Sequence, residues 1–300
     1  MKILLAGATG QVGHELLRAL QLPGNTPADT PAEIIAPGRQ QFDLADPMQL
    51  RRVIRDMKPD VIVNAAAYTD VDRAESEPAV AMRINADAPA IMAEEVARLG
   101  GALVHFSTDY VFNGEASAPY REQDLPDPVN AYGRSKLAGE QAIVAAGIPY
   151  LILRTGWVYG MRGRNFLQSI LHLAHQQDML QVVDDQFGTP TWCRTVADVT
   201  AQLLAMARSA TDAPQWWQEQ GGLLHMTARG STSRADFARR IIDLAGLSSR
   251  VNVVPVPTAD YPRAAVRPRY AVLDTGKLQG LCNLPHWDAA LQRCMQQASQ

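Results

Sequence analysis

The chain has 300 residues, of which 47% are hydrophobic and 20% charged, a balance typical of a folded globular protein. A net charge of −3 argues against a protein that coats nucleic acid or a membrane surface. The three cysteines, Cys193, Cys282 and Cys294, have no CxxC spacing, so neither a disulfide framework nor a zinc site is predicted. The N-terminal apolar run stops at Gly7, and no run reaches the ~20 apolar residues of a membrane span. We therefore expect a cytoplasmic protein.

The first half of the sequence alternates between predicted strands and helices. Nearly continuous apolar runs predict strands at 2–6, 33–38, 60–67, 102–108 and 149–155. Helices are predicted at 11–20, from the Asp46 cap and Pro47 onward, at 76–99 and at 130–146. Strands that are apolar throughout are typical of a parallel sheet buried on both faces. The pattern predicts an α/β fold, a Rossmann-like doubly wound parallel sheet with helices on both faces.

The alternation stops after about residue 160. Helices are predicted at 165–176, 195–208 and 234–245, with a strand followed by a loop at 180–192. We expect 209–222 to be an exposed connection and 251–269 to be a loop punctuated by proline. Residues 1–156, with 188–208 packing back, are predicted to form a dinucleotide-binding domain, and 157–187 with 222–300 a smaller α+β substrate domain. The proline-rich segment 22–31 has no predicted role.

A glycine-rich segment follows the first predicted strand, with Gly7, Gly10 and Gly13 at intervals of three and Gln11 and Val12 between them. Such a turn lets the backbone approach a pyrophosphate and offers a helix N-terminus to the anion. A glycine triplet is a weak signal alone, but its place between a strand and an amphipathic helix strengthens it. We predict a dinucleotide-binding loop; the alternative is a turn that serves packing only.

The ends of the second and third strands indicate which nucleotide binds. Arg39 stands where an NAD-selective site usually carries a carboxylate, and its guanidinium can pair with a 2′-phosphate. NADPH is therefore favoured, with NADH as the alternative. Asp43 and Leu44 are predicted to contact adenine. Small side chains after the third strand leave room for the cofactor, and the residues predicted to line its path are Ala65, Ala66, Ala67, Tyr68 and Thr69.

Candidate catalytic groups follow the fourth strand. Ligands of open α/β sheets bind beyond the carboxyl ends of the strands, so Thr108 and Asp109 should face the site. Tyr132 and Lys136 lie one helical turn apart and share a face. A tyrosine exchanges protons near neutrality only if its anion is stabilised, which a nearby cation does. A Thr108 hydroxyl on the reacting oxygen, a Tyr132 proton and a Lys136 contact to the nicotinamide ribose would support hydride transfer to a carbonyl.

Several motifs extend this pattern along the chain. They are GATGQVG, DVIVNAAAYTDVDRAESEP, STDYVFNG, AYGRSKLAGE and RTGWVYG, and they resemble the extended short-chain dehydrogenase/reductases, in detail the dTDP-4-dehydrorhamnose reductases. The resemblance is specific from residue 1 to about 195 and thinner through 184–191 and 261–268. It implies reduction of the 4-keto group of dTDP-4-dehydro-β-L-rhamnose to dTDP-L-rhamnose, a precursor of cell-surface polysaccharide.

The resemblance also implies roles for single residues. Tyr132 would protonate the sugar O4, with its pKa lowered by Lys136, and Thr108 would supply the hydroxyl of the triad while Asp109 contacts the sugar. Trp157 would line the sugar pocket, unless it only packs in the core. Two further residues are implied for the nucleotide-sugar pocket, Gln186 and Arg267, the latter as a diphosphate clamp with Arg263 and Arg269 as rivals.

No metal site is predicted. His172 and His175 lie three residues apart without a carboxylate to complete a motif. Some relatives form a dimer around Mg²⁺ held by glutamates; Glu15 is present here, but Arg194 stands where a second glutamate is expected. We therefore expect Glu15 to be an ordinary helix carboxylate. The expected partner is a small nucleotide sugar, with no nucleic acid or membrane, for a monomer or a homodimer.

Two other functions remain open at this point. An epimerase or dehydratase of the same fold would retain a tightly bound NAD and need a further acid/base pair near Thr108, where this sequence has Asp109-Tyr110-Val111. A non-catalytic regulatory subunit that senses NADP would keep the scaffold. The complete set of Thr108, Tyr132 and Lys136 favours an enzyme over that subunit.

Overall fold

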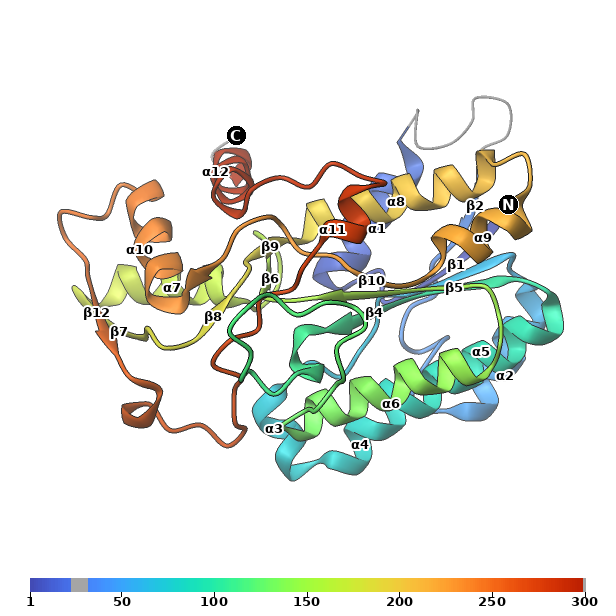
Figure 1. The fold of residues 1–300 in the computed structure, drawn as a ribbon, viewed down its shortest axis with the longest axis horizontal. Coiled ribbons are helices and arrows are strands. Elements are labelled where there is room, and N and C mark those ends of the chain that lie inside the picture. Colours follow the sequence, from blue (N-terminus) through green and yellow to red (C-terminus); the bar gives the residue numbers. More distant parts are fainter. Residues whose placement is uncertain (23–31, 299–300) are drawn as a thin grey trace.

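A parallel sheet forms the centre of the larger part of the molecule. Among residues 1–22 and 32–298, which the computed structural model describes, six strands are joined in the order β10-β5-β4-β3-β1-β2 (Figure 1). Residues 23–31 of the proline-rich segment lie outside the described residues. The strands are β1 (Lys2–Ala6), β2 (Glu33–Ile35), β3 (Val61–Asn64), β4 (Ala102–Thr108), β5 (Tyr150–Thr155) and β10 (Gly222–His225). In this sheet β2 lies on one side of β1 and β3 on the other, so the direction in which strands are added reverses at β1. A crevice opens at such a switch point, beyond the carboxyl ends of the strands.

Helices cover both faces of this sheet (Figure 1). On one face lie α1 (Gln11–Gln21) and α8 (Cys193–Ser209), whose apolar side chains pack on the strands with Ile3 and Leu5. On the other lie α2 (Pro47–Met57), α5 (Ala88–Leu99) and α6 (Ala131–Ala145), which pack on Leu4 and Ile62. Each fully buried leucine or isoleucine contributes roughly 1.5–3 kcal/mol. The predicted Rossmann-like parallel sheet with helices on both faces is therefore confirmed.

A smaller part with its own core lies beyond the carboxyl ends of these strands (Figure 1). Its strand pairs are β7 (Met179–Val183) with β12 (Asn252–Val256), β6 (Val158–Tyr159) with β9 (Thr191–Trp192), and β8 (Phe187–Gly188) with β11 (Thr232–Ser233). Its helices are α7 (Phe166–Gln176), α10 (Arg234–Leu244) and α12 (Trp287–Ala298). Tyr159, Leu167 and Phe237 are buried between them. Domain boundaries at the predicted positions stay a prediction.

Residues 76–99 are helical apart from Glu77, as predicted, but they form several elements. The structure has α3 (Val71–Ser76), α4 (Pro78–Met82), a π-helical turn (Arg83–Asp87) and α5. Glu77 leaves the helical conformation, because the residue before a proline is disfavoured in it, and Pro78 then starts the next helix. The second and third strands also end earlier than predicted, at Ile35 and Asn64, and the residues beyond them become loops at the crevice.

The segment 209–222 connects α8 to β10 and buries none of its residues, as expected, but it also contains a helix that was not predicted, α9 (Ala213–Gln220). Asp212 caps this helix by accepting the N–H of Gln215 at 2.9 Å, and Trp216 and Trp217 pack against the main core. The chain then enters β10, an edge strand that the sequence interpretation missed. No helix within residues 1–22 and 32–298 combines the length and the apolar character needed to span a bilayer.

The predicted loop 251–269 is wrong in its first part, which forms β12. Pro255 is tolerated because β12 is an edge strand of a two-stranded sheet, where a missing N–H can face away from the partner. Beyond it come a 3₁₀ turn (Thr258–Asp260) and α11 (Gly276–Gln279), and a second 3₁₀ turn (Asp109–Val111) follows β4.

Candidate active site

The glycine loop connects β1 to α1 at the crevice. Gly7 has φ +81°, a left-handed conformation that favours glycine, and a Cβ there would lie 2.7 Å from the Ala66 nitrogen. A Cβ at Gly13 would lie 2.0 Å from the Gly7 oxygen. The loop is closed by the Gly10 N–H, which donates to the Gly7 carbonyl at 2.9 Å. Both close approaches explain why side chains are excluded here, and they leave a cradle of bare backbone that fits a pyrophosphate.

The start of α1 faces the same crevice. Its N-cap is Gly10, and its first turn, with Gln11 and Val12, holds no acidic residue that would repel an anion. The Gln11 side chain is already engaged, because its Oε1 accepts a hydrogen bond from Asn165 Nδ2 at 2.8 Å. Asn165 also caps α7 through the N–H of Gln168 at 3.1 Å. The glycine loop is thereby tied to the smaller part of the molecule.

A groove of about 520 Å³ runs from the glycine loop across the ends of β1, β2 and β3. It brings together most of the residues predicted for the cofactor: Gly7, Arg39, Asp43, Leu44, Ala66, Ala67, Tyr68 and Thr69. Residues that the sequence interpretation missed also line it: Arg73, Glu77, Val80, Ile84 and Arg164. Two of them shape one wall, where Tyr68 Oη donates to Glu77 Oε2 at 2.9 Å and Arg73 pairs with Glu77 at 2.6 Å.

Arg39 lies at the open end of this groove. Its side chain is 82% exposed, and its Nε lies 3.9 Å from Asp43 Oδ1, a loose contact. The Asp43 carboxylate is used locally, because Oδ1 accepts the N–H of Ala45 at 3.0 Å. The guanidinium is therefore available for an anion at the position predicted for a 2′-phosphate.

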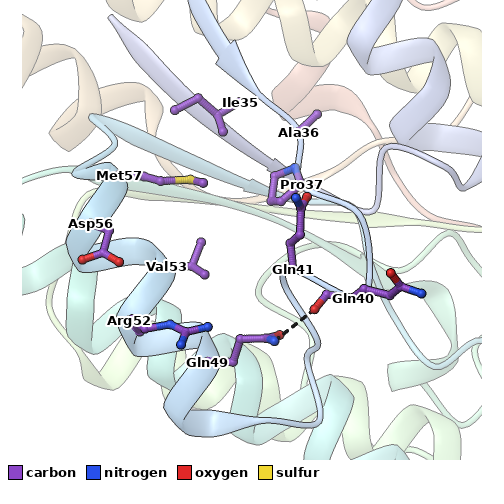
Figure 2. A pocket seen from close by; sticks show the side chains of 10 residues that line it. All are labelled: Ile35, Ala36, Pro37, Gln40, Gln41, Gln49, Arg52, Val53, Asp56 and Met57. Atoms are coloured by element: carbon purple, nitrogen blue, oxygen red, sulfur yellow. Dashed lines mark hydrogen bonds between the residues drawn. The ribbon is translucent and has the colours of Figure 1, made fainter.

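A second hollow of about 710 Å³ lies between β2 and α2 (Figure 2). It shares Ala36 and Pro37 with the groove, and Gln49 Nε2 donates to the Gln40 carbonyl at 3.1 Å across its floor. Arg52 of α2 also lines it and is exposed. Because this hollow lies on the outer side of the second strand, Arg52 is a natural control for Arg39.

The π-helical turn holds α6 in place beside the groove. Asn85 accepts the Tyr68 N–H at 2.8 Å and donates from Nδ2 to the Tyr68 carbonyl and to Ser135 Oγ, both at 3.0 Å. Ser135 Oγ in turn donates to the Tyr132 carbonyl at 2.7 Å. A Cβ at Gly139 would lie 2.1 Å from the backbone carbonyl oxygen of Asn85, so α6 packs directly on this turn. The start of α6 is thereby fixed against the loop that follows β3.

Thr108, Asp109 and Tyr132 meet at the carboxyl end of β4. Thr108 Oγ1 donates to Asp109 Oδ1 at 3.0 Å and interacts with the Tyr132 phenol. The Tyr110 and Tyr132 rings form an edge-to-face pair with centroids 6.2 Å apart. Asp109 Oδ2 is buried without a hydrogen-bond partner within the described residues. Burial raises the pKa of the Asp109 carboxyl to about 7, and it also raises the pKa of Tyr132.

Lys136 lies one turn along α6 and is 1% exposed. Its Nζ contacts His105 Nε2 at 3.0 Å and donates to the Phe106 carbonyl at 2.6 Å. Burial lowers the pKa of Lys136 to about 8. The amine is thus directed toward β4, and the predicted lowering of the Tyr132 pKa by Lys136 stays a prediction for a site that holds its ligands.

Arg234 is the residue at this site that the sequence interpretation missed. It starts α10, and its guanidinium carbon lies 3.6 Å from the centre of the Trp157 indole. It also interacts with Tyr110 and Asp109, but within the described residues it forms no ion pair with a carboxylate at hydrogen-bond distance. A weak indication of this position was present in the sequence, because Ser233 is a good N-cap and places Arg234 in the first turn of the helix.

Gln186 and Arg267 lie in the smaller part of the molecule. Gln186 is buried, and its Nε2 donates to Thr258 Oγ1 at 3.0 Å. Arg267 forms a two-pronged ion pair with Asp72 at 2.6 and 2.7 Å and interacts with Tyr110. Arg263 instead stacks on Tyr261, 4.7 Å from the ring centre. Arg234 and Arg267 thus both interact with Tyr110, and the Asp72 carboxylate pairs with Arg267.

Glu15 is paired within the chain. Its carboxylate accepts from Arg18 at 2.8 Å and from Arg194 at 2.8 Å and 3.2 Å. Arg194 reaches over from α8 and also contacts Gln297 of α12. No group of three or more histidine, cysteine, aspartate or glutamate side chains within 1–22 and 32–298 is arranged to hold a metal ion.

Comparisons with known proteins extend these observations. The family described as "RmlD substrate binding domain" matches residues 1–300. A dTDP-4-dehydrorhamnose reductase of Burkholderia thailandensis is 43% identical over 304 residues, covering 98% of each chain. A solved dTDP-4-dehydrorhamnose reductase of Clostridium acetobutylicum has a TM-score of 0.89 at 34% identity and covers 100% of each chain. Another, from Bacillus anthracis in complex with NADP, has a TM-score of 0.86 at 31% identity and covers 99% of each chain.

Proposed function

This chain belongs to the dTDP-4-dehydrorhamnose reductase family, and we propose that it reduces the 4-keto group of dTDP-4-dehydro-β-L-rhamnose to dTDP-L-rhamnose with NADPH. The comparisons confirm the resemblance that the motifs indicated, and they make the protein an NADP-dependent oxidoreductase of nucleotide-sugar biosynthesis. One observation carries the proposal for the site: Thr108, Asp109 and Tyr132 lie together where β4 ends, beside the glycine-loop groove.

The groove fits the cofactor. Gly7 and Gly13 leave the bare backbone that a pyrophosphate needs, and Arg39 would hold the 2′-phosphate. The adenine would lie near Asp43 and Leu44, and the nicotinamide ribose would lie toward Lys136. When bound, NADPH supplies the hydride that reduces the carbonyl carbon.

Tyr132 would donate the proton to the sugar oxygen. The phenol is protonated at neutral pH, as a general acid must be before it reacts. Because burial raises its pKa, the anion left after proton transfer needs a nearby cation, a role that Lys136 would take as an ammonium once the cofactor is bound. The Thr108 hydroxyl, which interacts with that phenol, would hydrogen-bond the same sugar oxygen. Asp109 would accept a hydrogen bond from a neighbouring sugar hydroxyl through its unpartnered Oδ2.

Two arginines would bind the diphosphate. Arg267 was expected in this role, and Arg234 lies closer to the catalytic cluster through its interactions with Asp109 and Tyr110. Arg234 has no carboxylate bonded to it within the described residues, so its guanidinium is suited to an anionic ligand, whereas Arg267 would have to share its hydrogen bonds between Asp72 and the phosphate. Trp157 would present its ring to the apolar side of the deoxyhexose, and Gln186 would contact the nucleotide.

Assembly and location belong to the proposal too. We infer a cytoplasmic enzyme that works as a monomer or a homodimer and needs no metal. The pairing of Glu15 with Arg18 and Arg194 supports the last point, because both carboxylate oxygens already accept hydrogen bonds. Sedimentation with and without a chelator tests the oligomeric state and whether a metal ion is needed for it.

The decisive experiment supplies dTDP-4-keto-6-deoxyglucose together with a 3,5-epimerase and follows the loss of NADPH absorbance. We expect stoichiometric oxidation of NADPH and formation of dTDP-L-rhamnose, identified by NMR. Net turnover without NADPH, by protein purified with tightly bound NAD, would instead indicate an epimerase or dehydratase. NADP binding without any turnover would indicate a regulatory subunit.

A further inference from the structure

The contacts of Lys136 constrain where its protons are. Its nitrogen lies within hydrogen-bond distance of His105 Nε2, at 3.0 Å, and of the Phe106 carbonyl, at 2.6 Å. The carbonyl can only accept, so the lysine donates one N–H to it. The direction of the second hydrogen bond depends on the tautomer of His105.

The other side of His105 determines that tautomer. Its Nδ1 lies 3.1 Å from Nδ2 of Asn64, the last residue of β3. The amide of Asn64 cannot be turned around, because its Oδ1 accepts the backbone N–H of Ala66 at 3.2 Å. Asn64 Nδ2 therefore donates, and His105 Nδ1 accepts.

A neutral imidazole carries one N–H, which must then be on Nε2. Both His105 and Asn64 are 1% exposed, and burial holds the pKa of His105 well below its ordinary value. The imidazole is therefore neutral, and its Nε2–H points at the Lys136 nitrogen. An ammonium has no lone pair with which to accept that hydrogen bond.

We propose that His105 is a positioning residue whose Nε2–H donates to the Lys136 nitrogen and thereby favours the neutral amine over the ammonium in the ligand-free site. Asn64 fixes the tautomer, His105 donates to the lysine nitrogen, and the lysine donates to the Phe106 carbonyl. The three elements β3, β4 and α6 are joined by this chain of hydrogen bonds.

The remaining charges around Lys136 leave this arrangement in place. Glu140, one turn further along α6, acts to raise the pKa of Lys136, yet burial outweighs it. The carboxylate of Glu140 is already neutralised by Arg154 of β5, at 2.6 and 2.9 Å. Tyr132 on the same helix is neutral because its pKa is raised.

A consequence follows for cofactor binding, and it rests on the proposed function. A neutral lysine must take up a proton before it can bind a ribose hydroxyl as an ammonium. Affinity for NADPH should therefore fall as the pH rises above about 8, the pKa to which burial lowers Lys136. Protonation of Lys136 and binding of NADPH would thus be coupled.

NMR of ligand-free protein labelled at the lysine side-chain carbons tests the proposal directly. The sequence contains four lysines, Lys2, Lys58, Lys136 and Lys277, and the Lys136→Met variant assigns the signal. We expect Lys136 to titrate near pH 8 and His105→Gln to raise that midpoint by about one to two pH units, because the amide oxygen can accept from an ammonium. His172→Gln, on the exposed side of α7, should leave it unchanged.

The tautomer is measured on the unchanged protein, so the test does not depend on whether His105→Gln folds. Nitrogen-15 shifts of the imidazole should show hydrogen on Nε2 and a bare Nδ1. Hydrogen on Nδ1, or a Lys136 midpoint in the ordinary lysine range of about 10.4, overturns the proposal. Neither measurement uses substrate, so failure here is distinct from failure to oxidise NADPH.

Discussion

The indole of Trp157 lies beneath the guanidinium of Arg234, with 3.6 Å between the guanidinium carbon and the ring centre. Trp157 has φ +47°, an uncommon backbone conformation for a residue other than glycine, and its ring also lies close to Gly188. A Cβ at Gly188 would lie 2.5 Å from the indole. The ring thus packs closely against both residues, and its stack with Arg234 positions the guanidinium, which interacts with Asp109.

Replacing Arg234 tests its role in binding the diphosphate. Arg234→Lys keeps the charge but loses the planar stack and the forked donors, so we expect KM for the nucleotide sugar to rise by about 10–100-fold. The KM for NADPH should stay within twofold. Arg239→Lys is the matched control, since Arg239 lies on the same helix and pairs with Asp236. Equal losses for cofactor and sugar would assign Arg234 to the fold and not to the substrate.

Tyr132→Phe removes the proposed proton donor and little else. The aromatic pair with Tyr110 would remain, so we expect kcat to fall by about 10²–10⁴-fold while NADPH binding is kept. Stopped-flow or steady-state measurement of NADPH oxidation gives the rate, and fluorescence gives the cofactor affinity. Tyr150→Phe, at the far end of β5, controls for loss of a tyrosine hydroxyl. Turnover that survives the change would remove Tyr132 from the mechanism.

Arg39→Ala tests the basis of cofactor choice. The exposed guanidinium is loosely held by Asp43 and is free to bind a 2′-phosphate, so its loss should raise KM for NADPH by about tenfold and leave KM for NADH nearly constant. Arg52→Ala, in the hollow on the other side of β2, should change neither value (Figure 2). An equal rise in KM for NADPH and NADH would mean that Arg39 does not recognise the 2′-phosphate.

The raised pKa of Asp109 predicts that the free energy of unfolding depends on pH. Its folded pKa of about 7 lies above the ordinary value of about 3.9, so the folded protein holds an extra proton between these values and stability falls as pH rises through that window. Asp109→Asn removes this penalty, and we expect about 1–3 kcal/mol of added unfolding free energy at pH 8, fading toward pH 4. Activity should fall in the same variant. Urea unfolding at both pH values measures the difference, with Asp260→Asn as an exposed control; a gain that does not vary with pH would contradict the prediction.

The fold of the first half could be predicted because each strand there is an apolar run between turn residues. β10 and β12 were missed for a physical reason: each is a short edge strand with a single partner, so burial leaves little pattern in its sequence. The division of the helix at 76–99 could have been predicted from Pro78 and Pro89, but the π-helical turn depends on the contact between Asn85 and Gly139 across two helices.

The residues of the candidate site also include some that the sequence could predict and some that it could not. Motif spacing was enough to bring Thr108, Asp109 and Tyr132 to one strand end, because β4 and α6 are neighbours in sequence and in space. Arg234 could not be found by spacing, since its contact with Trp157 joins segments distant in the chain. His105 was hidden for another reason: inside an apolar strand it resembles a core residue, and its two hydrogen bonds are visible only in three dimensions.

The position of β10 has a consequence for how the protein folds during synthesis. This strand completes the edge of the sheet beside β5, yet the smaller part of the molecule begins to be made in the interval between them. A ribosome that has just released β5 has therefore produced a sheet whose outer strand is unpaired, and such an edge is open to association with other chains. The nascent chain is exposed to that risk until residue 225 emerges, which makes β5 the segment where a chaperone or a stalled intermediate should be sought.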